Sequence, residues 1–360
     1  MPVAVMTDLK THLIDRITRT GPISIADYMA ECLLHPKFGY YTTRDPLGAA
    51  GDFTTAPEIS QMFGELIGLS LAQSWMDQGA PNAFILAEAG PGRGTLMADI
   101  LRATRKIPGF HAALRLHLIE ASPTLRAAQA DKLSGYAPTW HDVFATLPGS
   151  LPLYFVANEF FDALPVRQFI RDGDAWRERR IIVQDDGSLG FALAGPAPQE
   201  ALNHRLPDTA DGDLVELCSS APAIALDIGQ RIAEHGGAAL LIDYGDWRSL
   251  GDTLQALSNH EHADPLANPG QADLTTHVDF EAIAQAAPCK HTRLSTQGVF
   301  LERLGITARA QALAKRMQGA ELDELIAAHR RLTHPTEMGT LFKVIGLYPE
   351  GKNPPPGLEP

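Results

Sequence analysis

The segment Phe84-Ile-Leu-Ala-Glu-Ala-Gly-Pro-Gly-Arg-Gly-Thr-Leu96 is an apolar run that ends in three glycines spaced two apart. This pattern is typical of a buried strand that turns into a helix around a nucleotide-like ligand. Glycine lets the backbone approach a ligand where a Cβ atom would clash. The first turn of a helix beginning near Thr95 offers free N–H groups to a polar or anionic group. We therefore expect a ligand site at Gly90, Gly92 and Gly94.

Strand-like and helix-like segments alternate after this turn. Apolar runs at 114–119 and 153–157 predict further strands, and the stretches 95–106 and 123–133 have the pattern of helices. Such alternation predicts βαβ units, a parallel sheet and a ligand crevice at the carboxyl ends of the strands. The expected fold class is α/β with a Rossmann-like sheet.

The composition of the chain divides it into regions. Residues 1–80 carry helical patterns and a Pro-, Gly- and Tyr-rich loop, and we expect an N-terminal helical cap there. Residues 81–350 form the core domain, with an insertion at about 166–235. Asp-Gly turns separate strand-like runs in the insertion, which is the pattern of antiparallel hairpins. The tail at 351–360 contains three consecutive prolines, and we expect it to be disordered.

Charge and cysteine usage limit the class of protein. The chain has 360 residues, 45% hydrophobic content and a formal net charge of -13, as an ordinary globular protein does. This acidic balance argues against a nucleic-acid binder, which needs clustered Lys and Arg. Three widely spaced cysteines without Cys-x-x-Cys spacing indicate thiols in a reducing compartment. No apolar run approaches the ~18 residues of a membrane helix, so we expect a cytoplasmic protein without membrane insertion or a cleaved presequence.

The glycine spacing discriminates between ligands, whereas the acid after the strand at 114–119 fits either class of nucleotide ligand. In the dinucleotide fingerprint the third glycine comes three residues after the second, whereas Gly94 comes only two after Gly92, which disfavours NAD and FAD. Glu120 ends the second strand, where a carboxylate can accept hydrogen bonds from ribose hydroxyls. A further short strand is predicted near Thr139-Trp140, and Asp142 follows it, where it can accept a hydrogen bond from an adenine amino group.

Asn158, Glu159 and Asp162 follow the strand at 153–157. Carboxylates and amides at the end of a buried strand lie where reacting atoms sit in open α/β sheets. A buried carboxylate also needs a cationic or protonated partner. We therefore assign these three residues to catalysis, with stabilisation of a helix N-terminus as the alternative explanation of Asp162.

Two further patterns have ordinary structural explanations. Thr55-Ala-Pro-Glu58 has capping-box spacing, and Glu58 serves either as a helix cap or as a ligand contact. His260-Glu261-His262 with Asp264 suggests a metal, but alternating loop histidines without a third spaced ligand are usually solvated. We expect no metal site.

Taken together, these motifs resemble the MidA/NDUFAF7 family of class I adenosylmethionine-dependent methyltransferases, which are complex I assembly factors and include a protein-arginine methyltransferase. The resemblance covers nearly the whole chain. One departure is Ala89, where relatives usually carry Leu. The segments that carry the resemblance are 51–60, 90–96, 122–126, 158–165, 243–245 and 273–280.

The resemblance implies a seven-stranded sheet with its last strand antiparallel to the others, and S-adenosylmethionine as cofactor. The implied cofactor contacts are Asp52, Thr55, Glu88, Gly90, Gly92, Gly94, Glu120 and Asp142. It implies methyl transfer to an arginine of a protein, a complex I subunit or its bacterial counterpart. The expected location is the bacterial cytoplasm, or the mitochondrial matrix for a eukaryotic member, and a homodimer is one possible oligomeric state.

Three alternative functions stay open from the residues alone. One is an NAD-dependent oxidoreductase that uses the same glycine turn. A second is a small-molecule methyltransferase. The third is a non-catalytic assembly chaperone that holds adenosylmethionine only as a structural support.

Overall fold

The computed structural model describes residues 8–43, 55–258 and 261–360. Its largest sheet has a main path of seven strands in the order β15-β17-β10-β5-β2-β3-β4. The strands of this path are β2 Phe84–Ala89, β3 Leu114–Ile119, β4 Thr139–His141, β5 Leu153–Asn158, β10 Gly237–Asp246, β15 Lys290–His291 and β17 Phe342–Tyr348. Two short strands, β14 Val278–Asp279 and β16 Ser295–Thr296, pair with β10 and β17.

Strand direction in this sheet follows the expected pattern. Strands β4, β3, β2, β5 and β10 are parallel neighbours, whereas β17 runs antiparallel to β10. The register places Ala89 opposite both Ile119 and Ala157, so the carboxyl ends of β2, β3 and β5 meet at one edge. The predicted seven-stranded sheet with an antiparallel last strand is confirmed.

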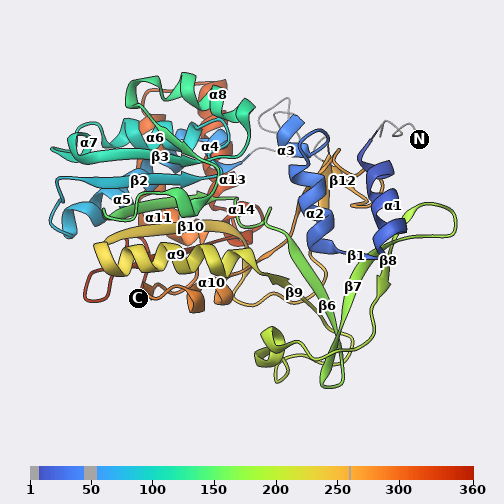
Figure 1. The fold of residues 1–360 in the computed structure, drawn as a ribbon. Helices are drawn as coiled ribbons and strands as arrows, with labels where there is room; N and C mark the ends of the chain where they lie inside the picture. Colours follow the sequence, from blue (N-terminus) through green and yellow to red (C-terminus); the bar gives the residue numbers. More distant parts are fainter. Residues whose placement is uncertain (1–7, 44–54, 259–260) are drawn as a thin grey trace.

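Helices pack on both faces of the main sheet (Figure 1). Alternate residues of β2 divide between the two faces: Phe84 and Leu86 pack with α5 and α6, and Ile85 and Ala87 with α9 and α10. The strand is apolar on both sides because both sides are covered. The helices around the main sheet and in the C-terminal region are α5 Gln61–Asp77, α6 Thr95–Thr104, α7 Phe110–Ala113, α8 Pro123–Lys132, α9 Ser220–His235, α10 Phe280–Ala286, α11 Gln297–Arg303, α12 Ile306–Ala314, α13 Ala320–Thr333 and α14 Met338–Leu341.

A second, antiparallel sheet lies beside the main one (Figure 1). Its order is β1-β7-β6-β9, with β8 paired to β7, and helices α1 and α2 pack on it through a separate apolar cluster. Its hairpin turns contain Gly173 and Gly187, both at positive φ, as the Asp-Gly signals predict. The bounds are α1 Leu9–Thr20, β1 Ile23–Ser24, α2 Ile25–Leu34, β6 Val166–Asp172, β7 Ala175–Val183, β8 Leu189–Leu193 and β9 Leu214–Cys218.

The remaining elements are short. A third sheet has the order β12-β11-β13, with β11 Gln255–Ser258, β12 Glu261–Ala263 and β13 Asp273–Thr275. Two one-turn helices, α3 Tyr40–Thr43 and α4 Ala56–Ile59, stand between the N-terminal helices and α5. Single turns of 3-10 helix lie at 134–136 and 144–146, and a longer one at 200–205. Across the described ranges, no helix is long and apolar enough to cross a membrane.

The structure divides the chain differently from the sequence analysis in two places. The inserted sheet ends at Cys218, because α9 packs on the main sheet and on α10. The N-terminal helices do not form one cap either, since α1 and α2 cover the second sheet whereas α5 belongs to the main core.

The prediction of a disordered tail at 351–360 is wrong. Leu358 is buried in the apolar cluster that contains α5. The Ser70 hydroxyl donates to the Pro356 carbonyl at 2.9 Å, and the Arg293 N–H donates to the Glu359 carbonyl at 2.9 Å. A proline-rich segment can pack without regular structure when one apolar side chain inserts into a core, and composition does not detect this.

Candidate functional site

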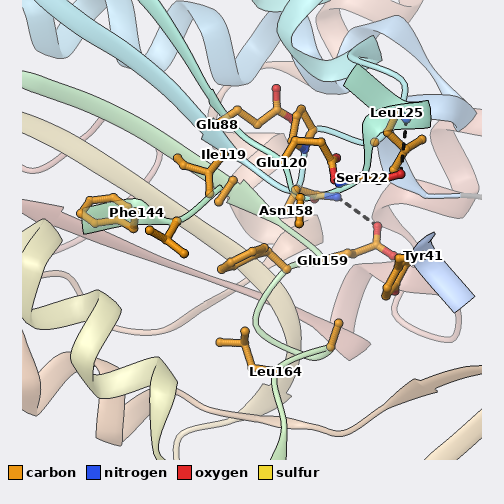
Figure 2. A pocket seen from close by; sticks show the side chains of 18 of the residues that line it. Tyr41, Glu88, Ile119, Glu120, Ser122, Leu125, Phe144, Asn158, Glu159 and Leu164 are labelled. Carbon is orange, nitrogen blue, oxygen red and sulfur yellow. Dashed lines mark hydrogen bonds between the residues drawn. The ribbon is translucent and has the colours of Figure 1, made fainter. Parts of the chain in front are cut away.

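A cavity of about 540 Å³ lies at the carboxyl ends of β2, β3 and β5. Its volume is that of a small-molecule site. Figure 2 shows Glu88, Glu120 and Glu159, which belong to or follow these three strands, around the same space. The predicted site residues that line it are Thr55, Glu88, Gly90, Gly92, Glu120, Asp142, Asn158 and Glu159.

Three other predicted site residues are not among the lining residues. Gly94 is the N-cap of α6 and has a φ of 78°, so the turn requires it without contact to the cavity. Asp162 lies in the loop that follows β5, is 5% exposed and does not line the cavity, so its catalytic role stays a prediction. Asp52 lies outside the described residues.

The glycine turn has the conformation that its sequence predicts. Gly90 and Gly92 have φ of 61° and 53°, in the left-handed region that residues with a Cβ atom rarely adopt. A Cβ atom on Gly90 would lie 3.1 Å from Cδ2 of Phe160, a ring in the cavity wall. The Gly92 carbonyl accepts a hydrogen bond from Gln129 Nε2 at 2.7 Å, which fixes the turn against α8.

Glu88 is a buried carboxyl group in the cavity wall. It is 2% exposed, and its Oε2 atom has no hydrogen-bond partner among the residues that the structure describes. Burial, followed by the nearby Glu120 carboxylate, raises the pKa of Glu88 to about 8. A buried carboxyl oxygen without a partner is costly, so this position suits a ligand that brings a cationic donor.

We expect Glu88→Gln to change how the stability of the ligand-free protein depends on pH. The unfolded chain releases the Glu88 proton near its ordinary pKa of 4.5, whereas the folded protein keeps it up to about 8. Between these values the folded state binds more protons, so the free energy of unfolding falls as pH rises. The variant lacks this loss and should unfold at a temperature ~3–6 °C above wild type at pH 8.5, but at a similar temperature at pH 5.

Thermal unfolding without added cofactor measures this difference. Glu65→Gln is the matched control, because the Glu65 carboxylate forms ion pairs with Arg102 and Arg309 at 2.6 and 2.8 Å and its loss should destabilise the protein. If the difference between Glu88→Gln and wild type is the same at pH 5 and pH 8.5, Glu88 is not a neutral acid in the folded protein.

Glu120 and Asp142 lie at the ends of their strands as predicted. Glu120 accepts hydrogen bonds from the Ser122 N–H at 2.8 Å and from Gln129 Nε2 at 3.2 Å, which fix its carboxylate toward the cavity. Burial raises its pKa, and the Ser122 N–H opposes that effect. Asp142 lies at the exposed rim, where its Oδ1 accepts from Arg126 at 2.6 Å.

Glu159 has unusual backbone geometry for a residue with a side chain. Its φ is 52°, and its N–H donates to the Ile242 carbonyl at 2.9 Å. Its Oε1 accepts hydrogen bonds from Asn158 Nδ2 at 3.1 Å and from the Ala56 N–H at 3.3 Å. Burial, followed by Asp162, raises the pKa of Glu159 to about 8. Local strain of this kind is concentrated at functional sites, where the surrounding structure enforces it.

Asp243 holds the loop that carries Glu159. Its Oδ2 accepts from the N–H groups of Phe160, Phe161 and Asp162 at 3.2, 2.9 and 3.2 Å. Burial, followed by Asp162 and Glu159, raises the pKa of Asp243 well above its usual value. In the sequence, Asp243 stands out only as part of a motif shared with the family. An acid directly after the apolar run at 237–242 is the signal that could have identified this role.

Asp162, Glu159 and Asp243 form a buried cluster of acidic side chains. Asp162 Oδ1 lacks a hydrogen-bond partner within the described ranges, and burial raises the pKa of Asp162 to about 6, against a hydrogen bond from Tyr244 that lowers it. The cluster continues to Asp273, whose Oδ1 accepts from the hydroxyl of Tyr41 at 2.8 Å. Tyr41, which the sequence analysis did not single out, lines the cavity beside Glu159 (Figure 2).

The two explanations of Glu58 are now distinguishable. In the described part of the chain, the Thr55 side chain makes no capping hydrogen bond to α4, so no capping box forms. The Glu58 carboxylate instead accepts from Thr95 Oγ1 at 2.5 Å and lines the cavity.

The expected absence of a metal stays a prediction, because His260 lies outside the described residues. The residues that could group around an ion within the described ranges are His12, Glu31 and His35, whose ligand atoms lie within 4.8 Å of one another. Arg16 already donates to Glu31 at 3.0 Å in that group.

Three features define the class of the protein. The main sheet has a path of seven strands with an antiparallel strand beside its edge, a glycine turn follows β2, and acids lie at the ends of neighbouring strands. Together they are the features of a class I methyltransferase. The family model described as "Putative S-adenosyl-L-methionine-dependent methyltransferase" matches residues 66–299, and the chain belongs to this family. The resemblance inferred from the sequence motifs is confirmed, and S-adenosyl-L-methionine is the cofactor.

Relatives of known name match over most of the chain. The chain is 38% identical to the mitochondrial protein arginine methyltransferase NDUFAF7 of Danio rerio, over 93% of this chain and 86% of the relative. It is 37% identical to the Homo sapiens protein of the same name, over 96% and 84%. A COG1565 superfamily member from Burkholderia thailandensis, solved with bound S-adenosyl-homocysteine, is similar at a TM-score of 0.83 and 28% identity, covering 97% of this chain and 93% of that one.

The charges of the cavity fit this cofactor. The sulfonium and ammonium groups of S-adenosylmethionine are cationic, and six acidic side chains line the cavity against one cationic side chain, Arg93, among the described lining residues. The six are Glu58, Glu88, Glu120, Asp142, Glu159 and Asp227. The expectation of an S-adenosylmethionine-dependent methyltransferase is confirmed, and the NAD-dependent alternative is excluded by the family.

Proposed function

We propose that the protein transfers a methyl group to an arginine side chain of a protein substrate. The observation that carries the proposal is Glu159, a carboxyl group in the cavity wall held by two N–H donors on strained backbone. A guanidinium is protonated at neutral pH, so its methylation needs a group that orients it and takes its proton. The name protein arginine methyltransferase, carried by the relatives, supports this substrate class.

The residues that would hold the cofactor follow from the chemistry of the wall. Glu88 would accept from the ammonium group, the backbone of Gly90 and Gly92 would approach the same end, and Glu120 and Asp142 would accept from the ribose and the adenine. Thr55 lines the cavity near this region, and we retain Asp52 as a proposed contact. When bound, S-adenosylmethionine supplies an electrophilic methyl group.

The chain itself supplies alignment and proton acceptance. The Glu159 carboxylate would accept hydrogen bonds from the guanidinium, align one nitrogen and take its proton as the new bond forms. Asn158 orients Glu159 through Nδ2, and its buried Oδ1, which has no partner in the described residues, is available to a substrate N–H. Asp162, beneath the cavity wall, acts as a positioning residue through its charge on Glu159.

We also propose a narrower substrate and location. The substrate is a subunit of respiratory complex I or its bacterial counterpart, as the family resemblance implies. The location is the bacterial cytoplasm, which the three free thiols Cys32, Cys218 and Cys289 support, although the relatives are named as mitochondrial. Fractionation of cells that express the tagged full chain tests the location.

Transfer of label to protein tests the proposed function. The full chain is incubated with methyl-labelled S-adenosylmethionine and a bacterial lysate, and labelled proteins are hydrolysed to amino acids. Labelled methylarginine supports the proposal, and mass spectrometry then identifies the substrate. Label only in the protein-free fraction would instead show a small-molecule methyltransferase. Cofactor binding without any labelled product would support the chaperone alternative.

A further inference from the structure

Helix α4 connects the start of α6 with the candidate catalytic carboxylate. At one end, Glu58 Oε1 accepts a hydrogen bond from Oγ1 of Thr95, the first residue of α6, at 2.5 Å. The same Thr95 oxygen accepts from Lys132 Nζ at 2.6 Å. These two contacts join α4, α6 and α8 beside the glycine turn.

The other end of α4 contacts Glu159. The Ala56 N–H donates to Glu159 Oε1 at 3.3 Å, across 103 residues of sequence. This N–H is at the first position of the helix, where no intrahelical acceptor exists. Ala56 and Glu58 lie in one helical turn, so the position of the Glu58 side chain constrains the position of the Ala56 N–H.

The contact bears on the proton affinity of Glu159. The Ala56 N–H and Asn158 both favour the ionised carboxylate and lower its pKa, against burial and Asp162, which raise it. One N–H donor changes a carboxyl pKa by about 0.5 to 1. Loss of the Ala56 contact would therefore leave Glu159 protonated up to a higher pH.

We propose that Glu58 and Thr95 are positioning residues: their hydrogen bond holds α4 against α6 and so keeps the Ala56 N–H on the Glu159 carboxylate. The proposal rests on the proposed role of Glu159 in methyl transfer. It assigns the N-terminal segment a task in the reaction, in addition to forming one wall of the cavity.

Thr95→Val and Thr95→Ser form a matched pair for the test. Valine has nearly the shape of threonine without the hydroxyl donor, whereas serine retains the hydroxyl. The pKa of Glu159 is measured by NMR titration of the full chain labelled with ¹³C at glutamate carboxyl carbons, and the resonance missing from Glu159→Gln identifies it. We expect a pKa about 0.5 to 1 higher in Thr95→Val and within about 0.2 of wild type in Thr95→Ser.

The methyl-transfer rate gives a second readout. Thr95→Val should be about 3- to 10-fold slower than wild type at pH 7, and the ratio should return toward one at pH 9, where Glu159 is ionised in both. A defect of general structure would not recover with pH. An unchanged Glu159 pKa in Thr95→Val would overturn the proposal.

Ala56→Pro is a second variant in case Thr95→Val does not fold. Proline lacks the N–H and is tolerated at the first position of a helix. It should raise the Glu159 pKa by the same amount, and an unchanged value would also overturn the proposal. The proposed function fails by a different result, which is full activity of Glu159→Gln. The titration does not depend on activity, so the two failures are distinguishable.

Discussion

Glu159→Gln is expected to slow methyl transfer by about 10²- to 10⁴-fold while cofactor affinity changes less than about twofold. The amide retains the size of the side chain and one acceptor for the Ala56 N–H and Asn158, so the loop should keep its geometry. What it loses is the charge that would align the guanidinium and the ability to take its proton. Labelled methyl transfer measures the rate, and calorimetry measures cofactor affinity.

The proposed role of Glu159 also predicts how the methyl-transfer rate of the wild-type protein depends on pH. Because the Glu159 carboxyl has a pKa of about 8 in the ligand-free protein, kcat/KM should rise with pH through this range. Asp162→Asn is the matched comparison. It removes the nearby carboxyl that helps to raise the Glu159 pKa, so the rise should occur at a lower pH. Turnover near the wild-type rate in Glu159→Gln would remove Glu159 from the mechanism.

Local sequence patterns were sufficient to predict the parallel strands β2, β3 and β5 and the side of the cavity at their carboxyl ends, whereas the antiparallel last strand was implied by the family resemblance. An apolar run followed by glycines or by an acid identifies the carboxyl end of a strand, and parallel strands place those ends at one edge. Glu88, Glu120 and Glu159 therefore meet around one cavity, as their places at the carboxyl ends of three strands require. This prediction needed no knowledge of side-chain packing.

Contacts between segments that are distant in the sequence could not be predicted from those local patterns. Asp243 accepts hydrogen bonds from the N–H groups of residues more than 80 positions earlier in the chain. The Ala56 N–H donates to Glu159, which lies 103 residues later. Each contact depends on how a loop folds after the sheet has formed. For the same reason, capping-box spacing alone could not decide between the two roles of Glu58, whose carboxylate accepts a hydrogen bond from Thr95. Leu358 shows that composition also misses a single apolar anchor.

Gly92→Val is expected to weaken S-adenosylmethionine binding by at least about 100-fold while the sheet stays folded. Gly92 has a φ of 53° and lines the cavity, so a branched side chain there would be strained and would occupy the space of the ligand. The strain alone should lower the free energy of unfolding by ~1–3 kcal/mol. Calorimetric titration with the cofactor measures affinity, and circular dichroism with thermal unfolding measures the fold.

Gly173→Val separates strain from loss of the site. Gly173 has a similar φ of 60°, lies in the hairpin turn between β6 and β7, and has no atom within 4 Å of an added Cβ. This variant should lose comparable stability but bind S-adenosylmethionine with wild-type affinity, because its turn is remote from the cavity lining. Equal loss of affinity in both variants would attribute the effect to general destabilisation. Retained binding in Gly92→Val would show that the glycine turn does not hold the cofactor.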